Sequence, residues 1–263
     1  MNIWRPAGRT EGASPPISPG TPGSVIGFIM MGGSAVLETH LHSNLPPGVE
    51  MATTRVPFHQ VSYQGLLEMT GQLPQAARIL AETRPGVIAV ASFTGSCLRG
   101  SEIVNMIQQA TGIPTLVPAL ELARILNLLG AERIAMVTCF SQELRTLEQL
   151  FFKSRRIEIV KFLEAAAQPE DPFQVSRVDD EQILEQLRRE DFRGVDAVVV
   201  DLPAFVIGPE LQARLDQFLR VPVLNMARVL LWSALETAGA PTGDLYLTKL
   251  LPRVCPGEPA EKE

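Results

Sequence analysis

Three side chains that could transfer a proton or attack a carbon atom follow short apolar segments: Ser92, Cys139 and Asp201. Asp201 could be a general base or a ligand contact. If Leu202 points into a cleft, however, alternation along a strand turns Asp201 away from it, into a structural role. A thiol such as Cys139 is reactive once its pKa approaches neutrality, whereas no nearby histidine or lysine activates the Ser92 hydroxyl. We treat all three as candidate catalytic residues.

A small polar run, Thr94-Gly95-Ser96, precedes a predicted helix. Its N–H groups and hydroxyls could bind a carboxylate at the positive end of that helix. Ordinary N-capping by Thr94 or Ser96 is the alternative. Cys97, one turn further, is expected to be a small core residue.

Two other motifs indicate no cofactor. Glu38, His40 and His42 lie close together, but histidines two residues apart do not match the four-residue spacing of a helical zinc site. Gly32-Gly33 is not part of a G-x-G-x-x-G sequence, so it does not indicate a dinucleotide site. We therefore expect neither a metal nor an organic cofactor.

Strand-like and helix-like segments alternate from Ser24 onward. Continuous apolar runs of strand length predict strands that are buried on both faces, as in a parallel sheet. The predicted strands are 25–31, 87–92, 134–138, 197–200 and 221–224, and the predicted helices are 63–83, 96–111, 119–129, 142–154, 180–190, 209–218 and 227–238. This alternation is typical of a doubly wound α/β fold.

The pattern occurs twice. Ile26 to Ser92 spans 66 residues and Ile134 to Leu202 spans 68, and in each half a second strand, a helix and a proline follow at similar spacing. We therefore predict two pseudo-symmetric, doubly wound parallel-sheet lobes with a central cleft. Ligands of such sheets bind at the carboxyl ends of the strands. The expected cleft residues are Ser34, 92–96, 138–140 and 201–205.

This organisation predicts five segments. Residues 1–23, rich in Pro, Gly and Ser, are expected to be a disordered leader. Residues 24–130 and 131–225 form the two lobes, 226–255 return to the first lobe as a helix and segment, and 256–263 form a polar tail.

Composition excludes several classes of partner. The 263 residues are 46% hydrophobic and carry a net charge of −6 without a basic stripe, which argues against nucleic-acid binding. No apolar run reaches the ~20 residues that cross a bilayer, so we expect no membrane partner. Three cysteines make an odd, sparse set that fits a reducing, cytoplasmic location.

Several segments resemble one family in order and spacing. The chain is similar to the aspartate/glutamate/hydantoin racemase superfamily, in its branch of maleate cis-trans isomerases and arylmalonate decarboxylases. The segments that carry the resemblance are 25–29 with Glu38, 54–56, 87–89, 94–96, Arg99-Gly100, 111–114, 129–135, 196–198 and 221–223. Together they span roughly residues 24–239.

The resemblance implies a two-sided active site in which a cysteine of each lobe flanks a small carboxylate. Here Ser92 and Leu202 align with these cysteines, Ser34 with an asparagine of the opening loop, and Phe140 with a tyrosine. Pro203 follows the second position and has no N–H to offer an oxyanion. The implied substrate-binding residues are Ser34, Phe93, Thr94, Gly95, Ser96, Phe140, Leu202 and Pro203. Relatives self-associate, so a homo-oligomer is expected.

Three functions remain open. The chain could isomerise, racemise or decarboxylate a small carboxylate with altered, non-cysteine chemistry. It could instead be a catalytically inactive homologue that binds a small ligand or serves as an accessory protein. Because Phe93, Phe140, Leu202 and Phe205 would make the cleft apolar, an aromatic or aliphatic acid is the third possibility.

Overall fold

The computed structural model describes residues 25–165, 171–175, 179–203, 205 and 207–251. The predicted leader (1–23) and polar tail (256–263) lie outside the described residues, as does Cys255. No helix in the described ranges is both long and apolar enough to cross a membrane.

Two four-stranded parallel sheets form the centre of the molecule. The first contains β1 (Val25–Met31), β2 (Glu50–Val56), β3 (Val87–Val90) and β4 (Thr115–Leu116), in the order β2-β1-β3-β4. The second contains β5 (Arg133–Thr138), β6 (Glu158–Glu164), β7 (Ala197–Asp201) and β8 (Val223–Asn225), in the order β6-β5-β7-β8. The identical strand order confirms the predicted pseudo-symmetric α/β fold.

The register of the two sheets aligns the two halves. Ile26 lies opposite Val87 in the first sheet, and Ile134 lies opposite Ala197 in the second. Ser92 lies five residues after Val87, and Leu202 lies five residues after Ala197. Ser92 and Leu202 therefore occupy equivalent positions in the two halves. By the same register Asp201 is equivalent to Ala91 of the first half.

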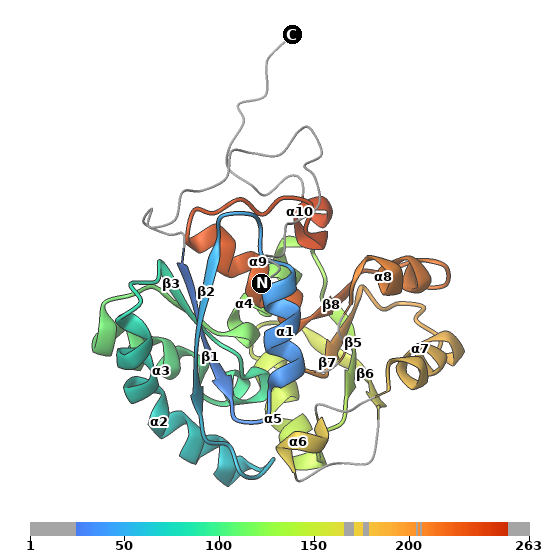
Figure 1. Ribbon diagram of the computed structural model, residues 1–263. Coiled ribbons are helices and arrows are strands. Elements are labelled where there is room, and N and C mark those ends of the chain that lie inside the picture. The colour runs from blue at the N-terminus through green and yellow to red at the C-terminus, as the bar shows by residue number, and fades with distance from the viewer. Residues whose placement is uncertain (1–24, 166–170, 176–178, 204, 206, 252–263) are drawn as a thin grey trace, which may run out of the picture.

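Helices cover both faces of each sheet (Figure 1). They are α1 (Ala35–Ser43), α2 (Tyr63–Ala81), α3 (Phe93–Thr111), α4 (Pro118–Leu128), α5 (Gln142–Lys153), α6 (Pro172–Val175), α7 (Asp180–Arg189), α8 (Pro209–Asp216), α9 (Met226–Thr237) and α10 (Tyr246–Leu250). In Figure 1, α2 and α3 lie outside the first sheet, α7 and α8 lie outside the second, and α4 and α9 lie between them.

Local sequence signals fix several helix ends. The side chains of Ser62, Asp179 and Asn225 each accept a hydrogen bond from a backbone N–H of the first turn of α2, α7 and α9. Helix α3 ends at Gly112, whose φ of 72° is left-handed and therefore favours glycine. The predicted helix that began at residue 96 starts three residues earlier, at Phe93.

Alternation along the central strands divides the core into two layers. Phe28 and Met30 of β1 pack into the layer shared by both sheets, which also contains Met136 of β5 and Trp232 of α9. Ile29 faces the opposite way, toward the layer beneath the outer helices. Because α9 packs against α4, the chain returns to its first half after the second sheet is complete.

Candidate active site

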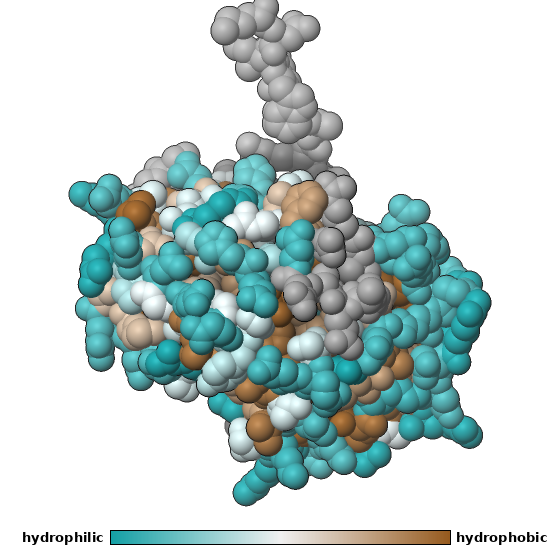
Figure 2. Space-filling model, turned by 90° about the horizontal axis from the view of Figure 1, so that it is seen from below, coloured by the Kyte–Doolittle hydropathy of each residue, from teal (hydrophilic) through white to brown (hydrophobic). Residues whose placement is uncertain are grey.

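A pocket with a cavity volume of about 60 Å³, open to solvent on one side, lies at the carboxyl ends of the strands. Figure 2 views the molecule from this end, where hydrophobic residues show between hydrophilic ones. Most residues that line the pocket are apolar, a usual property of small-molecule sites. They are Met31, Gly33, Ser34, Phe58, Val61, Leu66, Ala91, Ser92, Phe93, Thr94, Phe140, Leu144, Pro172, Val175, Asp201, Pro203 and Met226.

Two serines line the pocket at the start of helices in the first half. Ser34 precedes α1 and Ser92 precedes α3, and each occupies an N-cap position without capping its helix. Within the described ranges neither hydroxyl has a hydrogen-bond partner in the protein. Both hydroxyls are therefore available to a ligand.

The Thr94-Gly95-Ser96 turn contributes only its first side chain to the pocket. The Ser96 hydroxyl donates to Phe93 O at 2.7 Å and accepts from Ala119 N at 3.0 Å, which ties α3 to α4. A Cβ atom on Gly95 would lie 2.6 Å from Ser92 Oγ, so a side chain does not fit there. Gly95 and Ser96 hold the turn in place, while Thr94 lines the pocket.

Asp201 points into the pocket. This differs from the arrangement considered from the sequence, in which Leu202 faces the cleft and Asp201 is turned away from it. Asp201 ends β7 and lines the pocket, whereas Leu202 is 3% exposed and belongs to the apolar core. Phe205 is also a core residue and does not line the pocket. Pro203 does line it. Strand alternation thus places the carboxyl group, and not the apolar side chain that follows it, toward a ligand.

Glu148 is a polar residue of the site that sequence analysis missed. It lies on α5 and has no exposed surface. Thr94 Oγ1 donates to Glu148 Oε1 at 3.0 Å and lies 3.3 Å from Asp201 Oδ2. The signal was present, because Glu148 occupies the same helix face as the apolar Leu144 and Phe151.

Burial changes the protonation of both carboxyl groups. Loss of water raises the pKa of Asp201 to about 7, although hydrogen bonds from Glu148 and Thr94 oppose the change. Burial also raises the pKa of Glu148 well above its usual range, and the nearby charge of Asp201 adds to this shift. Asp201 therefore gains and loses a proton near neutral pH, as a general acid or base requires.

The two described cysteines are not in a reactive state. Cys139 is 1% exposed and does not line the pocket, and burial, with Asp201 adding to it, raises its pKa to about 12. Burial likewise raises the pKa of Cys97 well above its ordinary value. Both thiols stay protonated at neutral pH and are poor nucleophiles. Phe140, the residue after Cys139, does line the pocket.

The histidines of α1 lie away from this pocket. Burial lowers the pKa of His40 to about 4, with the positive charge of Arg228 adding to the effect. His40 Nδ1 lies 3.2 Å from Asn44 Nδ2. Among the described residues, no three His, Cys, Asp or Glu side chains gather as a metal site would require.

Comparison with known proteins places this geometry in a family. The sequence model of the family described as arylmalonate decarboxylase matches residues 40–250. The chain belongs to the arylmalonate decarboxylase family. This assignment confirms the resemblance to the maleate isomerase and arylmalonate decarboxylase branch.

Individual relatives agree with the assignment. A maleate isomerase from Nocardia farcinica is 25% identical over 229 residues, which cover 82% of this chain and 90% of that protein. A variant of the maleate cis-trans isomerase from that organism, with a covalently bound succinylcysteine intermediate, superimposes with a TM-score of 0.74 at 23% identity, covering 82% of this chain and 93% of the other. A liganded variant of arylmalonate decarboxylase also gives 0.74, at 18% identity, covering 83% and 93%. These structures share the fold.

Proposed function

We propose that this member of the arylmalonate decarboxylase family binds a small carboxylic acid with an apolar substituent, and that Asp201 transfers a proton to or from the carbon beside the carboxyl group. The observation that carries the proposal is the position of Asp201. It is a buried carboxyl group that faces the pocket and titrates near neutral pH. Proton transfer at such a carbon is the step that racemisation and decarboxylation share.

The first half supplies a place for the substrate carboxylate. The first N–H groups of a helix have no acceptor within the helix, and the start of α3 faces the pocket through Phe93 and Thr94. The free hydroxyls of Ser34 and Ser92 add two donors beside it. The same donors stabilise the negative charge that develops on the carboxylate when the neighbouring carbon loses its proton.

The apolar wall selects the substituent. Phe58, Val61, Leu66, Phe140 and Leu144 line the pocket without offering a hydrogen bond from their side chains. A second carboxylate or ammonium group placed against them would lose its hydration without a partner. An aryl or alkyl group would instead bury apolar surface there. We therefore expect acids with one apolar substituent to bind more tightly than maleate.

The test follows the exchange of a carbon-bound hydrogen for deuterium. Aryl- and alkyl-substituted acetic and malonic acids are incubated with the protein in D₂O at pH 7, and proton NMR records loss of the C–H signal. Asp201→Asn should slow the exchange by at least ~100-fold, because general acid–base catalysis contributes about 10²–10⁴-fold. The matched control is Asp191→Asn, which makes the same change at an exposed carboxylate. Equal rates in wild type and Asp201→Asn would rule out the assigned role of Asp201.

A second candidate function is ligand binding without turnover. It is favoured by the protonated state of both described thiols and by the core position of Leu202. Here an acid at 100 times its dissociation constant would stabilise the protein by about 2.7 kcal/mol without any exchange. Thermal unfolding with the same acids separates the two functions. If no acid stabilises the protein, neither function holds.

A further inference from the structure

Three polar side chains in mutual contact lead from the pocket into the interior of the protein. Asp201 and Thr94 line the pocket, whereas Glu148 lies behind them and does not. The Thr94 hydroxyl is within hydrogen-bonding reach of both carboxyl groups, at 3.0 Å from Glu148 and 3.3 Å from Asp201. The three side chains come from α3, α5 and β7, so only the fold brings them together.

The single hydrogen of the Thr94 hydroxyl means that the two carboxyl groups need at least one proton between them. It carries one hydrogen and can donate only one of its two contacts. If both carboxyl groups were ionised, one would receive nothing from the hydroxyl, and two like charges would face each other inside the protein. If one is protonated, it donates to the hydroxyl oxygen, and the hydroxyl donates to the other carboxylate. With a single proton, both contacts are hydrogen bonds.

No described cation pairs with the two carboxyl groups. Arg145, on the same helix as Glu148, donates to Glu164 at 2.6 Å, and its Nε is buried without a partner. Glu148 Oε2 is likewise buried without a partner, although the two carboxyl groups lie close enough for each to shift the pKa of the other. The other titratable groups near the pair are the thiols of Cys97 and Cys139, which burial keeps protonated. The charge of Arg145 lowers the pKa of Glu148 only as the smallest of the effects on it, so a second negative charge on the pair would be largely uncompensated.

We propose that Glu148 and Asp201 hold a single proton between them through the Thr94 hydroxyl, and that Glu148 is the positioning residue that sets the protonation of Asp201. The shared proton follows from the contacts alone, whereas its use in a reaction rests on the proposed function. Of the two groups, Glu148 has no exposed surface and does not line the pocket, so its charged form is the less solvated and it holds the proton in preference. Asp201 is then the group that becomes a carboxylate, at the pocket wall, as the pH rises through about 7.

The shared proton balances the proposed reaction. The carboxylate of Asp201 takes the proton from the substrate carbon, the C–H bond breaks, and its electron pair moves into the substrate carboxylate. An O–H bond forms at Asp201, so the pair then holds two protons and no charge. Return of a proton from Asp201 to the carbon restores the one-proton state. The pair thus alternates between charges of −1 and zero and never carries two buried negative charges.

The test is an NMR titration of protein labelled with ¹³C at the carboxyl carbons of Asp and Glu, without any ligand. In wild type, the signals of Glu148 and Asp201 should move together in two shared steps, with one proton remaining between the steps. In Glu148→Gln, Asp201 should titrate in a single step whose midpoint differs from both by at least ~1 pH unit. Glu143→Gln, an exposed change on the same helix, should leave the Asp201 titration as in wild type.

Two variants of Thr94 make the link itself testable. Thr94→Ser keeps a hydroxyl and should retain the two shared steps, whereas Thr94→Val removes it and should shift both midpoints by ~1 pH unit or more. Two ionised carboxyl groups at pH 7 in wild type would overturn the proposal, even if every variant failed to fold. So would an Asp201 titration that Glu148→Gln leaves unchanged. If the two carboxyl groups titrate together but no acid exchanges deuterium, the shared proton stands and the proposed function is refuted. If exchange depends on Asp201 but the two groups titrate independently, the proposed function stands and the shared proton is refuted.

Discussion

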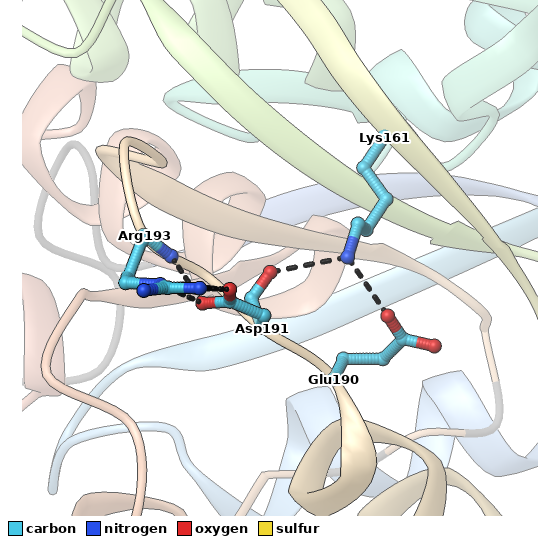
Figure 3. A network of polar contacts seen from close by, with 4 residues as sticks. All are labelled: Lys161, Glu190, Asp191 and Arg193. Carbon is cyan, nitrogen blue, oxygen red and sulfur yellow. Dashed lines mark hydrogen bonds and ion pairs between the residues drawn. The ribbon is translucent and has the colours of Figure 1, made fainter.

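Two groups of carboxylates in the second half of the chain have opposite surroundings. At the turn before β7, Lys161 donates to Glu190 at 2.8 Å and to Asp191 O at 3.1 Å, and Arg193 pairs with the Asp191 carboxylate at 2.6 Å (Figure 3). Asp201 in the pocket wall and Glu148 behind it share the Thr94 hydroxyl, and within the described part of the chain neither forms an ion pair. Surroundings, and not residue type, decide what each carboxyl group can do.

The pKa directions follow from that difference. Hydrogen bonds from Arg193 lower the pKa of Asp191, so it stays ionised and serves as an anchor for the turn. Burial raises the pKa of Asp201 to about 7, so it changes charge at the pH at which enzymes work. The exposed network fixes a loop, whereas the buried pair retains a proton that a ligand can use.

The largest expected effect is the pH dependence of stability. Native Asp201 keeps its proton up to about pH 7, whereas the unfolded chain loses it near 3.8. Between these values the native state binds more protons, so the free energy of unfolding falls as pH rises, and the loss is complete above pH 7. Asp201→Asn should remove part of this fall and stabilise the protein by a few kcal/mol at pH 8, with no gain at pH 4. Urea unfolding at a series of pH values measures it.

Asp191→Asn provides the opposite case. Because Arg193 lowers the pKa of Asp191, this carboxylate stabilises the native state above its ordinary pKa, and that stabilisation is lost as pH falls. The variant should therefore lose a little stability at pH 8 and none at the lowest pH. If both variants responded to pH in the same direction, the contrast between the two regions would be wrong.

A smaller effect is expected when the shared hydroxyl is removed. Thr94→Val keeps the shape of the side chain but leaves two buried carboxyl groups without their common partner. Loss of a buried hydrogen-bond partner costs about 1–3 kcal/mol, which urea unfolding at pH 6 can measure. Thr146→Val, at an exposed position of α5, is the control and should change stability by less than ~0.5 kcal/mol. Equal effects at the two positions would mean that the pair does not depend on the hydroxyl.

Much of the fold was predictable, because central strands are buried on both faces. The residues of β1, β3, β5 and β7 form continuous apolar runs that indicate a parallel sheet. Strands β2 and β6 were missed, since they lie at sheet edges and carry exposed or charged residues such as Arg55 and Lys161. β4, with two residues, gives no periodic signal.

The candidate site was predictable only at strand ends. Ser92, Thr94 and Asp201 could be placed together because the carboxyl ends of parallel strands meet at one edge. The direction of Asp201 depended on where alternation starts, and the sequence does not show this. Glu148 lies on a helix, 54 residues from Thr94, and its role arises only when α5 packs behind the pocket. The one feature of the sequence that could have identified Glu148 is its position as a charged residue on an otherwise apolar helix face.

The smallest effect is expected in the exposed network of Figure 3. Lys161→Ala breaks the contacts with Glu190 and Asp191, but the Lys161 and Glu190 side chains are about one-third exposed, so water replaces much of the lost interaction. Exposed ion pairs contribute about 0.2–1 kcal/mol, and salt weakens them. Urea unfolding in low and high salt should show a loss in this range that shrinks as salt is added, while the effect of Asp201→Asn should change much less, because Asp201 is 2% exposed and salt screens buried groups weakly. If salt reduced both effects equally, the Asp201 carboxyl group would be screened like an exposed one, and the contrast between the two regions would be wrong.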